Sequence, residues 1–292
     1  MRLKAYYPLP KFPPISLSGA ACKLHCAHCD ATYLGGMLPA DTPEALVDRC
    51  RALRQNGAIG ALLSGGSDAD GTLLNLAAMT DAIRQAKQET GLIFNLHPGL
   101  IDAATASALT VDFASLDIPS DNVIRRMLGL DATTADYIAA YRTLRAAGID
   151  VVPHVTVYNG DEAGLLRPIA AGGDVPLGGL PHVVVVIVFS PTRGTPMADA
   201  PAPGAEAVAN VVAEVKTLFP EAEIALGCMR PRTRALREAI ELAALRAGVA
   251  RMELPSQKTL RYARDAGYEI FSFNACCALP EAYESIAVRP EA

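Results

Sequence analysis

Short apolar runs alternate with segments of helical period along the whole chain, and this alternation constrains the fold more than any other feature of the sequence. Two parallel strands need a crossover connection, usually a helix, so the alternation predicts a parallel sheet. The predicted strands cover residues 15–18, 60–64, 92–96, 111–117, 150–157, 183–189, 222–227 and 249–254. Eight such units in 292 residues predict a single-domain α/β fold, a full TIM-type (β/α)8 barrel, with a doubly wound open sheet as the alternative.

The helical segments carry their own boundary signals. In residues 133–148 apolar side chains recur on one helical face, Thr133 or Thr134 can cap the start, and Gly148 can end the helix. No linker divides the chain. We therefore expect an N-terminal arm over 1–14, the barrel over 15–267, and a C-terminal segment over 268–292.

The composition argues against several classes of protein. A net charge of −5 argues against a nucleic-acid partner. Residues 1–14 hold prolines where a signal peptide needs an apolar run, and the most apolar segment, Val183–Phe189, is too short to span a bilayer. We expect a cytoplasmic protein with no membrane partner. Its thiols would stay reduced there, so clustered cysteines indicate metal binding or catalysis.

Polar or glycine-rich segments accompany every predicted strand end. In a parallel barrel the loops at the C-terminal strand ends form the active site. Along the chain these features are the cysteine-rich stretch after the first strand, 64–71, 97–99, 117–121, His154 within the fifth strand, 190–196, 227–232 and 255–258. Polar loops are ordinary at these positions. The cysteines after the first and seventh strands need another explanation.

Three cysteines after the first strand, Cys22, Cys26 and Cys29, have the spacing C-x3-C-x2-C. Four thiolates would complete an iron–sulfur cluster or a structural zinc site, whereas three leave one iron of a four-iron cluster open to a further ligand. The alternatives are zinc with His25 or His28 as fourth ligand, or an inert loop. The place of the triplet after the first strand of a barrel-like chain favours the open cluster.

The cysteine spacing, the "SGGS" segment after the second strand and the strand–helix alternation together resemble the radical S-adenosylmethionine (radical SAM) superfamily. The resemblance covers most of the chain. It implies a radical SAM TIM-type barrel in which the three cysteines bind a 4Fe–4S cluster and S-adenosylmethionine chelates the open iron. One-electron cleavage of S-adenosylmethionine would then release a 5′-deoxyadenosyl radical that abstracts hydrogen from an unactivated carbon.

The resemblance also assigns residues near S-adenosylmethionine. The glycine-rich strand end that meets its methionyl amino group is formed by Ser64, Gly65 and Gly66. Ser67 stands where the family often has an acidic residue, so Asp68 or a backbone carbonyl would replace that residue. The family often has an aromatic residue before the third cysteine. Here that residue is His28, which would stack near the adenine.

Four further residues have two interpretations each. His97 and His154 would contact S-adenosylmethionine or substrate, or serve as structural groups. Asp117 would bind the ribose hydroxyls or cap the next helix. Thr192 begins the segment "TRGTP", which resembles the turn that cradles adenine in the family and is equally well an ordinary turn.

The remaining cysteines suggest a second metal site. Cys50 lies at helical spacing from leucines and is expected in the core. Cys228 ends the seventh strand, and Cys276 and Cys277 form a vicinal pair near the C-terminus. Each alone would be an ordinary free cysteine. Together they predict an auxiliary iron–sulfur cluster, whose fourth ligand could be Arg230, Arg232, Ser67 or an exogenous group.

A second cluster without a long cysteine-rich extension resembles the sulfur-inserting branch, biotin synthase and the lipoyl synthases. The segments "LSGGSDADG" and "GCMRPR" and the "CC" pair are most similar to a subunit of the two-component lipoyl synthases. This resemblance implies sulfurtransferase activity in lipoate biosynthesis, with sulfur supplied by the auxiliary cluster. The implied partners are an octanoylated carrier protein or lipoyl domain, a companion radical SAM subunit, and an electron donor such as ferredoxin or flavodoxin.

Two other functions stay open at this point. One is a different radical SAM reaction, such as biotin-synthase-like thiolation of a free small molecule or a methyl transfer. The other is non-enzymatic, an iron–sulfur electron-transfer protein or a zinc protein.

Overall fold

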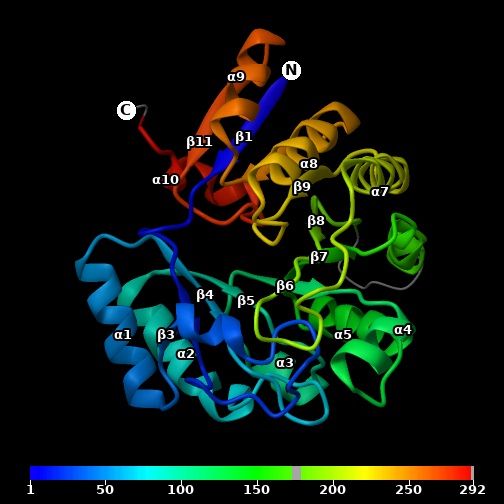
Figure 1. Cartoon of the computed structure of the whole chain (residues 1–292). Coiled ribbons are helices and arrows are strands. Elements are labelled where there is room, and N and C mark those ends of the chain that lie inside the picture. The colour runs from blue at the N-terminus through cyan, green and yellow to red at the C-terminus, as the bar shows by residue number, and fades with distance from the viewer. Residues whose placement is uncertain (173–178, 291–292) are drawn as a thin grey trace. The chain divides into compact units, whose positions relative to one another are not determined.

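The computed structural model describes residues 1–172 and 179–290, which form two compact units (Figure 1). The N-terminal unit is Leu9–Val151. The C-terminal unit consists of Met1–Pro8 and the described residues from Val152 onward. Residues 291–292 of the expected C-terminal segment lie outside the described part of the chain.

The N-terminal unit contains a parallel sheet with the strand order β3-β2-β4-β5-β6. Ile15 pairs with Leu63, and Leu63 pairs with Leu96, so apolar side chains align across the strands. These side chains are fully buried and form the core with helical residues such as Ile83. The strands are β2 (Pro14–Ser16), β3 (Leu38–Pro39), β4 (Gly60–Ser64), β5 (Ile93–Leu96) and β6 (Phe113–Asp117).

The helices of this unit begin and end at the expected kinds of residue. Thr42 caps α1 by accepting a hydrogen bond from the Ala45 amide at 3.2 Å, and Gly91 ends α2 in the left-handed conformation. Helices α1 and α2 pack side by side (Figure 1). The helical elements are η1 (Thr32–Gly36), α1 (Pro43–Gln55), α2 (Leu76–Thr90), α3 (Ala103–Ala108), α4 (Asp121–Val123), the π-helix η2 (Ile124–Leu128) and α5 (Thr134–Ala146).

The C-terminal unit contains a second parallel run of strands in the order β7-β8-β9-β10-β1-β11. Strand β1 lies between β10 and β11, so part of the expected N-terminal arm is a strand here. The "VVVVIV" run forms β8 and is almost completely buried. The strands are β1 (Arg2–Tyr6), β7 (Asp150–Val157), β8 (Val183–Val188), β9 (Glu223–Leu226), β10 (Arg251–Glu253) and β11 (Glu269–Phe273).

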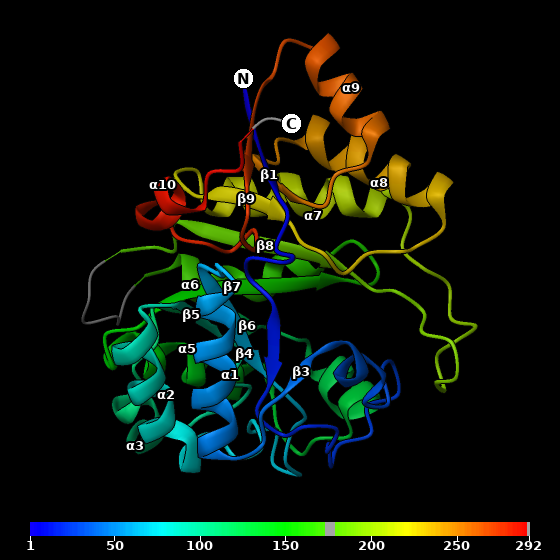
Figure 2. The same ribbon diagram turned by 90° about the vertical axis from the view of Figure 1, so that its left-hand side faces the viewer.

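Helices α7 and α8 of this unit pack side by side (Figure 2). Gly248 ends α8 in the left-handed conformation, and Ser256 caps α9 by accepting from the Thr259 amide. The helical elements are η3 (Glu162–Leu166), α6 (Arg167–Ala170), α7 (Ala205–Leu218), α8 (Arg234–Ala247), α9 (Gln257–Asp265), η4 (Glu281–Tyr283) and α10 (Glu284–Ala287).

The structure confirms the predicted parallel arrangement of strands and helices. Each of the eight predicted strands is present, and the described chain adds β1, β3 and β11. The helix predicted over 133–148 is α5, which Thr133 begins through a capping box with Asp136. Within the described residues, no helix is long and apolar enough to cross a membrane.

Candidate metal centres

The loop that carries the cysteine triplet follows β2 and has an unusual backbone. His25, Asp30 and Ala31 adopt positive φ values of 48°, 42° and 58°, although none is a glycine. Such conformations cost free energy and persist where surrounding contacts enforce them, often at functional sites. Here the Ala27 amide donates to the Met127 carbonyl of the π-helix η2 at 2.8 Å, and the Cys29 amide donates to the Cys26 carbonyl at 3.1 Å. The loop is therefore held in one conformation.

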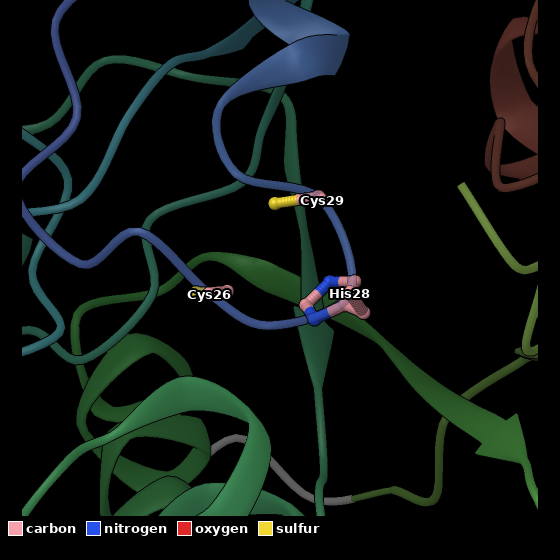
Figure 3. Close-up of side chains that lie close together, drawn as sticks. All are labelled: Cys26, His28 and Cys29. Carbon is pink, nitrogen blue, oxygen red and sulfur yellow. The ribbon is translucent and has the colours of Figure 1, made fainter. Parts of the chain in front are cut away.

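Cys26, His28 and Cys29 form a compact group of possible metal ligands (Figure 3). Their ligand atoms all lie within 4.8 Å of one another, with Cys26 buried and the other two half-buried. Cys22 is half-buried, and the structure does not place it within this group. Thiolates and imidazole are ligands for zinc, and thiolates also hold iron–sulfur clusters.

The pKa values of the two thiols in this group are shifted in opposite directions. A hydrogen bond from Cys26, and then the neighbouring His28, lower the pKa of Cys29 to about 4. The same hydrogen bond to Cys29, together with burial, raises the pKa of Cys26. The Nδ1 atom of His28 is buried and, among the described residues, has no hydrogen-bond partner. A thiolate beside an unsatisfied imidazole nitrogen suits metal binding, so the donor set fits both an iron–sulfur cluster and zinc.

The glycine-rich segment after β4 packs against the cysteine loop. The Gly66 amide donates to Ser18 Oγ at 2.7 Å. A Cβ atom added to Gly66 would lie 2.0 Å from the Ala21 carbonyl oxygen and 2.6 Å from Cys22 Cβ. Gly66 is thus a glycine because the chain bearing Cys22 passes directly over it. This packing role was not apparent from the sequence, where Gly66 was assigned to S-adenosylmethionine.

A second contact ties the same two loops together. The Lys23 amide donates to the Ser67 carbonyl at 2.8 Å, and Lys23 Nζ pairs with Asp68 at 3.0 Å. A hydrogen bond from the Ala69 amide and the pairing with Lys23 lower the pKa of Asp68. The Asp68 carboxylate, suggested above as a replacement for the family's acidic residue, is therefore committed to holding the cysteine loop. Ser64 and Gly65 lie on the same strand end, next to Gly66.

Asp117 and Tyr137 lie near the triplet in the same unit. Asp117 is the exposed last residue of β6, and Ser120 rather than Asp117 caps the helix that follows. Burial raises the pKa of Tyr137, and the nearby Asp117 and Cys26 raise it further, so the phenol lies close to both groups. The helical pattern assigned Tyr137 only to packing. His97 directly follows β5, and its amide donates to the Leu63 carbonyl at 2.9 Å.

Two of the predicted residues, His154 and Thr192, belong to the C-terminal unit. His154 is buried in β7, where its Nδ1 lies 3.0 Å from the Val152 carbonyl oxygen. Thr192 Oγ1 donates to the Ser190 carbonyl at 3.3 Å, and its own carbonyl accepts from Thr195. These contacts are typical of a structural histidine and of a turn. The predicted contact of either residue with S-adenosylmethionine stays a prediction.

Cys228, Cys276 and Cys277 lie near one another in the C-terminal unit, and the buried side chain of Glu253 lies beside Cys228 and Cys277. The Glu253 carboxyl accepts a hydrogen bond from the Cys277 amide at 3.2 Å and is hydrogen-bonded to the thiols of Cys228 and Cys277. Cys228 is exposed, Cys276 is half-buried and Cys277 is buried. Desolvation and the neighbouring carboxyl raise the pKa of both Cys228 and Cys277. The structure thus brings the three cysteines of the predicted auxiliary site into one neighbourhood, and it adds Glu253, which the sequence did not identify.

Arg230, one of the fourth-ligand candidates, is committed elsewhere. Its guanidinium is buried, pairs with Glu241 at 3.0 Å and donates to the backbone carbonyls of Gly227, Glu253 and Leu254. The guanidinium therefore serves the folding of this strand end. Ser67, another candidate, lies in the N-terminal unit with the triplet. Cys50 is fully buried in α1, as expected for a core residue.

No protein-family model matches this sequence, and comparison with curated proteins finds no match. Solved structures do match. Methylornithine synthase (PylB) is 19% identical with a TM-score of 0.58, covering 88% of this chain and 74% of its own. The FeFe-hydrogenase maturase HydG from Carboxydothermus hydrogenoformans is 17% identical with a TM-score of 0.64, covering 97% of this chain and 69% of its own.

A third structure, Streptococcus suis SuiB bound to S-adenosylmethionine, is 12% identical with a TM-score of 0.50 and covers 94% of this chain. The chain spans 58% of the length of SuiB. At these identities the likeness concerns the fold. The predicted α/β fold class, with parallel strands alternating with helices, is confirmed.

Proposed function

We propose that this chain is a radical SAM enzyme in which Cys22, Cys26 and Cys29 hold a 4Fe–4S cluster. The observation that carries the proposal is the cysteine loop itself, which brings the ligand atoms of Cys26, His28 and Cys29 within 4.8 Å of one another directly after an early strand of a parallel β/α fold. When bound, the cluster with S-adenosylmethionine would supply a carbon-centred radical, chemistry that no side chain can provide. The likeness of the fold to a structure bound to S-adenosylmethionine supports this reading.

The chain's own residues would orient these groups and keep water from them. Gly66 and the Lys23–Asp68 pair fix the loop against the end of β4. Asp117 carries an exposed carboxylate at the end of β6, which suits hydrogen bonding to ribose hydroxyls. Tyr137 lies near both Asp117 and Cys26 and would help to exclude water from the site.

Zinc is the second candidate for the triplet, because His28 lies within ligand distance of Cys26 and Cys29. Iron and acid-labile sulfide in anaerobically purified protein separate the two. The radical SAM proposal expects iron with sulfide, and 5′-deoxyadenosine when S-adenosylmethionine and dithionite are added. Zinc without sulfide, or iron without 5′-deoxyadenosine, would contradict it.

For the reaction itself we propose sulfur insertion at an unactivated carbon of a protein-bound octanoyl chain, as a lipoyl synthase component. The nearness of Cys228, Cys276 and Cys277 to one another supports an auxiliary cluster that supplies the sulfur. The proposal includes a companion radical SAM subunit and a small electron-transfer protein as partners. Biotin-synthase-like thiolation of a free small molecule is the alternative.

Substrate trials test this finer proposal. Octanoylated lipoyl-domain peptide, S-adenosylmethionine and reductant are supplied with and without a companion subunit, and thiolated octanoyl product is measured by mass spectrometry. The matched control is the Cys228→Ala protein, which should still form 5′-deoxyadenosine but no thiolated product. Formation of 5′-deoxyadenosine without thiolated product in the unmodified protein would leave a radical SAM enzyme and exclude the lipoyl assignment.

A further inference from the structure

Glu253, the last residue of β10, is a buried carboxyl in a cysteine-rich surrounding. Its side chain is only 6% exposed, it accepts from the Cys277 amide at 3.2 Å, and the Cys228 and Cys277 thiols are hydrogen-bonded to it. Burying a carboxyl is costly unless its oxygens have partners. Two of the partners here are thiols, which lose their protons when they bind a metal.

We propose that Glu253 is the fourth protein ligand of a metal cluster held by Cys228, Cys276 and Cys277, through a carboxylate oxygen. The inference rests on the auxiliary cluster of the proposed function and names a residue for its missing donor. On binding, the thiol protons and any proton on Glu253 pass to solvent, and bonds to iron replace the hydrogen bonds between thiols and carboxyl.

Arg230, another candidate for this ligand, is already engaged. The Arg230 guanidinium is occupied by Glu241 and by backbone carbonyls. Glu253 is the residue whose side chain is hydrogen-bonded to two of the three cysteines.

Strand β10 holds Glu253 and the cysteine pair in fixed relation. Arg251, two residues earlier and so on the same face of the strand, donates to the carbonyls of Cys277 at 3.2 Å and Leu279 at 2.6 Å. Leu254, the next residue after Glu253, is held at φ 48°, and its carbonyl accepts from Arg230 at 3.0 Å. A ligand on a rigid strand, with its neighbours fixed on both sides, is pre-organised for binding.

A carboxylate oxygen would make one iron of the cluster different from the others. Carboxylates are harder ligands than thiolates and hold soft iron–sulfur centres less tightly. The iron bound by Glu253 would therefore exchange its ligand most readily. This property suits a cluster that gives up a sulfide, since opening it requires one weak attachment.

The test uses the full chain with Cys22, Cys26 and Cys29 replaced by Ala, so that only the auxiliary site can hold a cluster. We expect about four irons per chain after anaerobic reconstitution, with one iron distinct in the 57Fe Mössbauer spectrum. In this background Glu253→Gln should lose the distinct iron and release iron to a chelator at least about tenfold faster. Glu253→Cys should keep the iron, make the four sites alike and slow the release. Glu238→Gln, which alters a carboxylate paired with Arg234 and Lys258, is the control and should change neither property.

The outcomes separate the two proposals. A background chain that binds no iron removes the auxiliary cluster and the Glu253 inference together. A background chain that binds iron, with Gln and Cys variants of the same spectrum and release rate, removes Glu253 alone. If Glu253→Gln fails to fold by circular dichroism, the Cys variant decides: a spectrum identical to that of the background overturns the inference.

Discussion

The two cysteine sites of this chain are built in opposite ways. The triplet lies within one short loop, so its three cysteines are neighbours along the chain. The second group takes one cysteine from the end of β9 and two from beyond β11, and the fold brings them together. A loop can present ligands in any strained conformation that its contacts enforce, whereas the second group depends on the sheet for its geometry.

The two sites also differ in the pKa values of their thiols. At the triplet, one thiol donates to another and lowers the pKa of Cys29 to about 4. At the second group, desolvation and the Glu253 carboxyl raise the pKa of Cys228 and Cys277. The surroundings of the first site thus favour the thiolate form of Cys29, and those of the second site favour the protonated forms of Cys228 and Cys277.

The strongest test of this separation is Cys26→Ser. Loss of one of three thiolates should remove the cluster at the triplet, and 5′-deoxyadenosine formation should fall to the background rate. Iron at the second site should stay at about four per chain, because the two sites share no ligand. Iron and sulfide analysis with product detection by mass spectrometry measures both effects. Full 5′-deoxyadenosine formation in the variant would place the radical chemistry elsewhere.

Arg251→Met should affect the second site and leave the triplet unchanged. Arg251 is 1% exposed, pairs with Glu223 at 2.5 Å and Glu284 at 2.9 Å, and holds the carbonyl of Cys277. Breaking a buried ion pair from one side should lower the free energy of unfolding by about 3 kcal/mol. Auxiliary iron should fall while 5′-deoxyadenosine formation continues.

Urea unfolding and iron analysis measure these effects. The control is Arg2→Met, which removes an exposed pair with Glu269 at 3.8 Å and should cost less than about 1 kcal/mol. If the Arg251 and Arg2 variants were equally stable and equally rich in iron, β10 would not position the second site.

Alkylation of the metal-free protein compares the two sites directly. A lowered pKa means that Cys29 stays a thiolate as the pH falls, until the pH approaches about 4. Cys228 is exposed but has a raised pKa, so its thiolate fraction drops tenfold for each pH unit below neutrality. At pH 6 iodoacetamide should modify Cys29 faster than Cys228 by about a hundredfold, after allowing for the weaker nucleophilicity of a low-pKa thiolate. Peptide mass spectrometry at pH 5, 6 and 8 measures the rates, and parallel pH profiles would contradict the opposite pKa shifts of Cys29 and Cys228.

A feature could be predicted from the sequence where its interacting residues lie close together along the chain, and was missed where they come from distant segments. The eight predicted strands were visible because their apolar runs reflect burial on both faces, as in β8. Strand β1 was missed because Lys4 interrupts its apolar pattern. The structure shows that Lys4 is paired with Glu223 and Glu284 inside the unit. A buried charge with partners from distant segments leaves no local signal.

The same reasoning explains the two sites. Cys22, Cys26 and Cys29 were identified because their spacing is local. Glu253 was missed because a single glutamate at the end of a strand is ordinary until cysteines from two other segments are known to lie beside it. Tyr137 was likewise assigned to a helix face, and only the fold brings it near Cys26.

The smallest expected effect, and the most local, belongs to Gly66→Ala. The added Cβ would lie 2.0 Å from the Ala21 carbonyl oxygen, so the loop bearing Cys22 must shift. Such overpacking should lower the free energy of unfolding by about 1–3 kcal/mol, and it should reduce iron at the triplet while auxiliary iron is retained. Gly36→Ala is the matched control, because a Cβ there would meet no atom within 4 Å. Urea unfolding and iron analysis of both variants measure the difference. Equal stability and equal iron content in the two variants would mean that the triplet loop adjusts freely and does not depend on the glycine-rich strand end. The triplet would then not be a site enforced by close packing of loops, and its contrast with a site built by the sheet would be weaker.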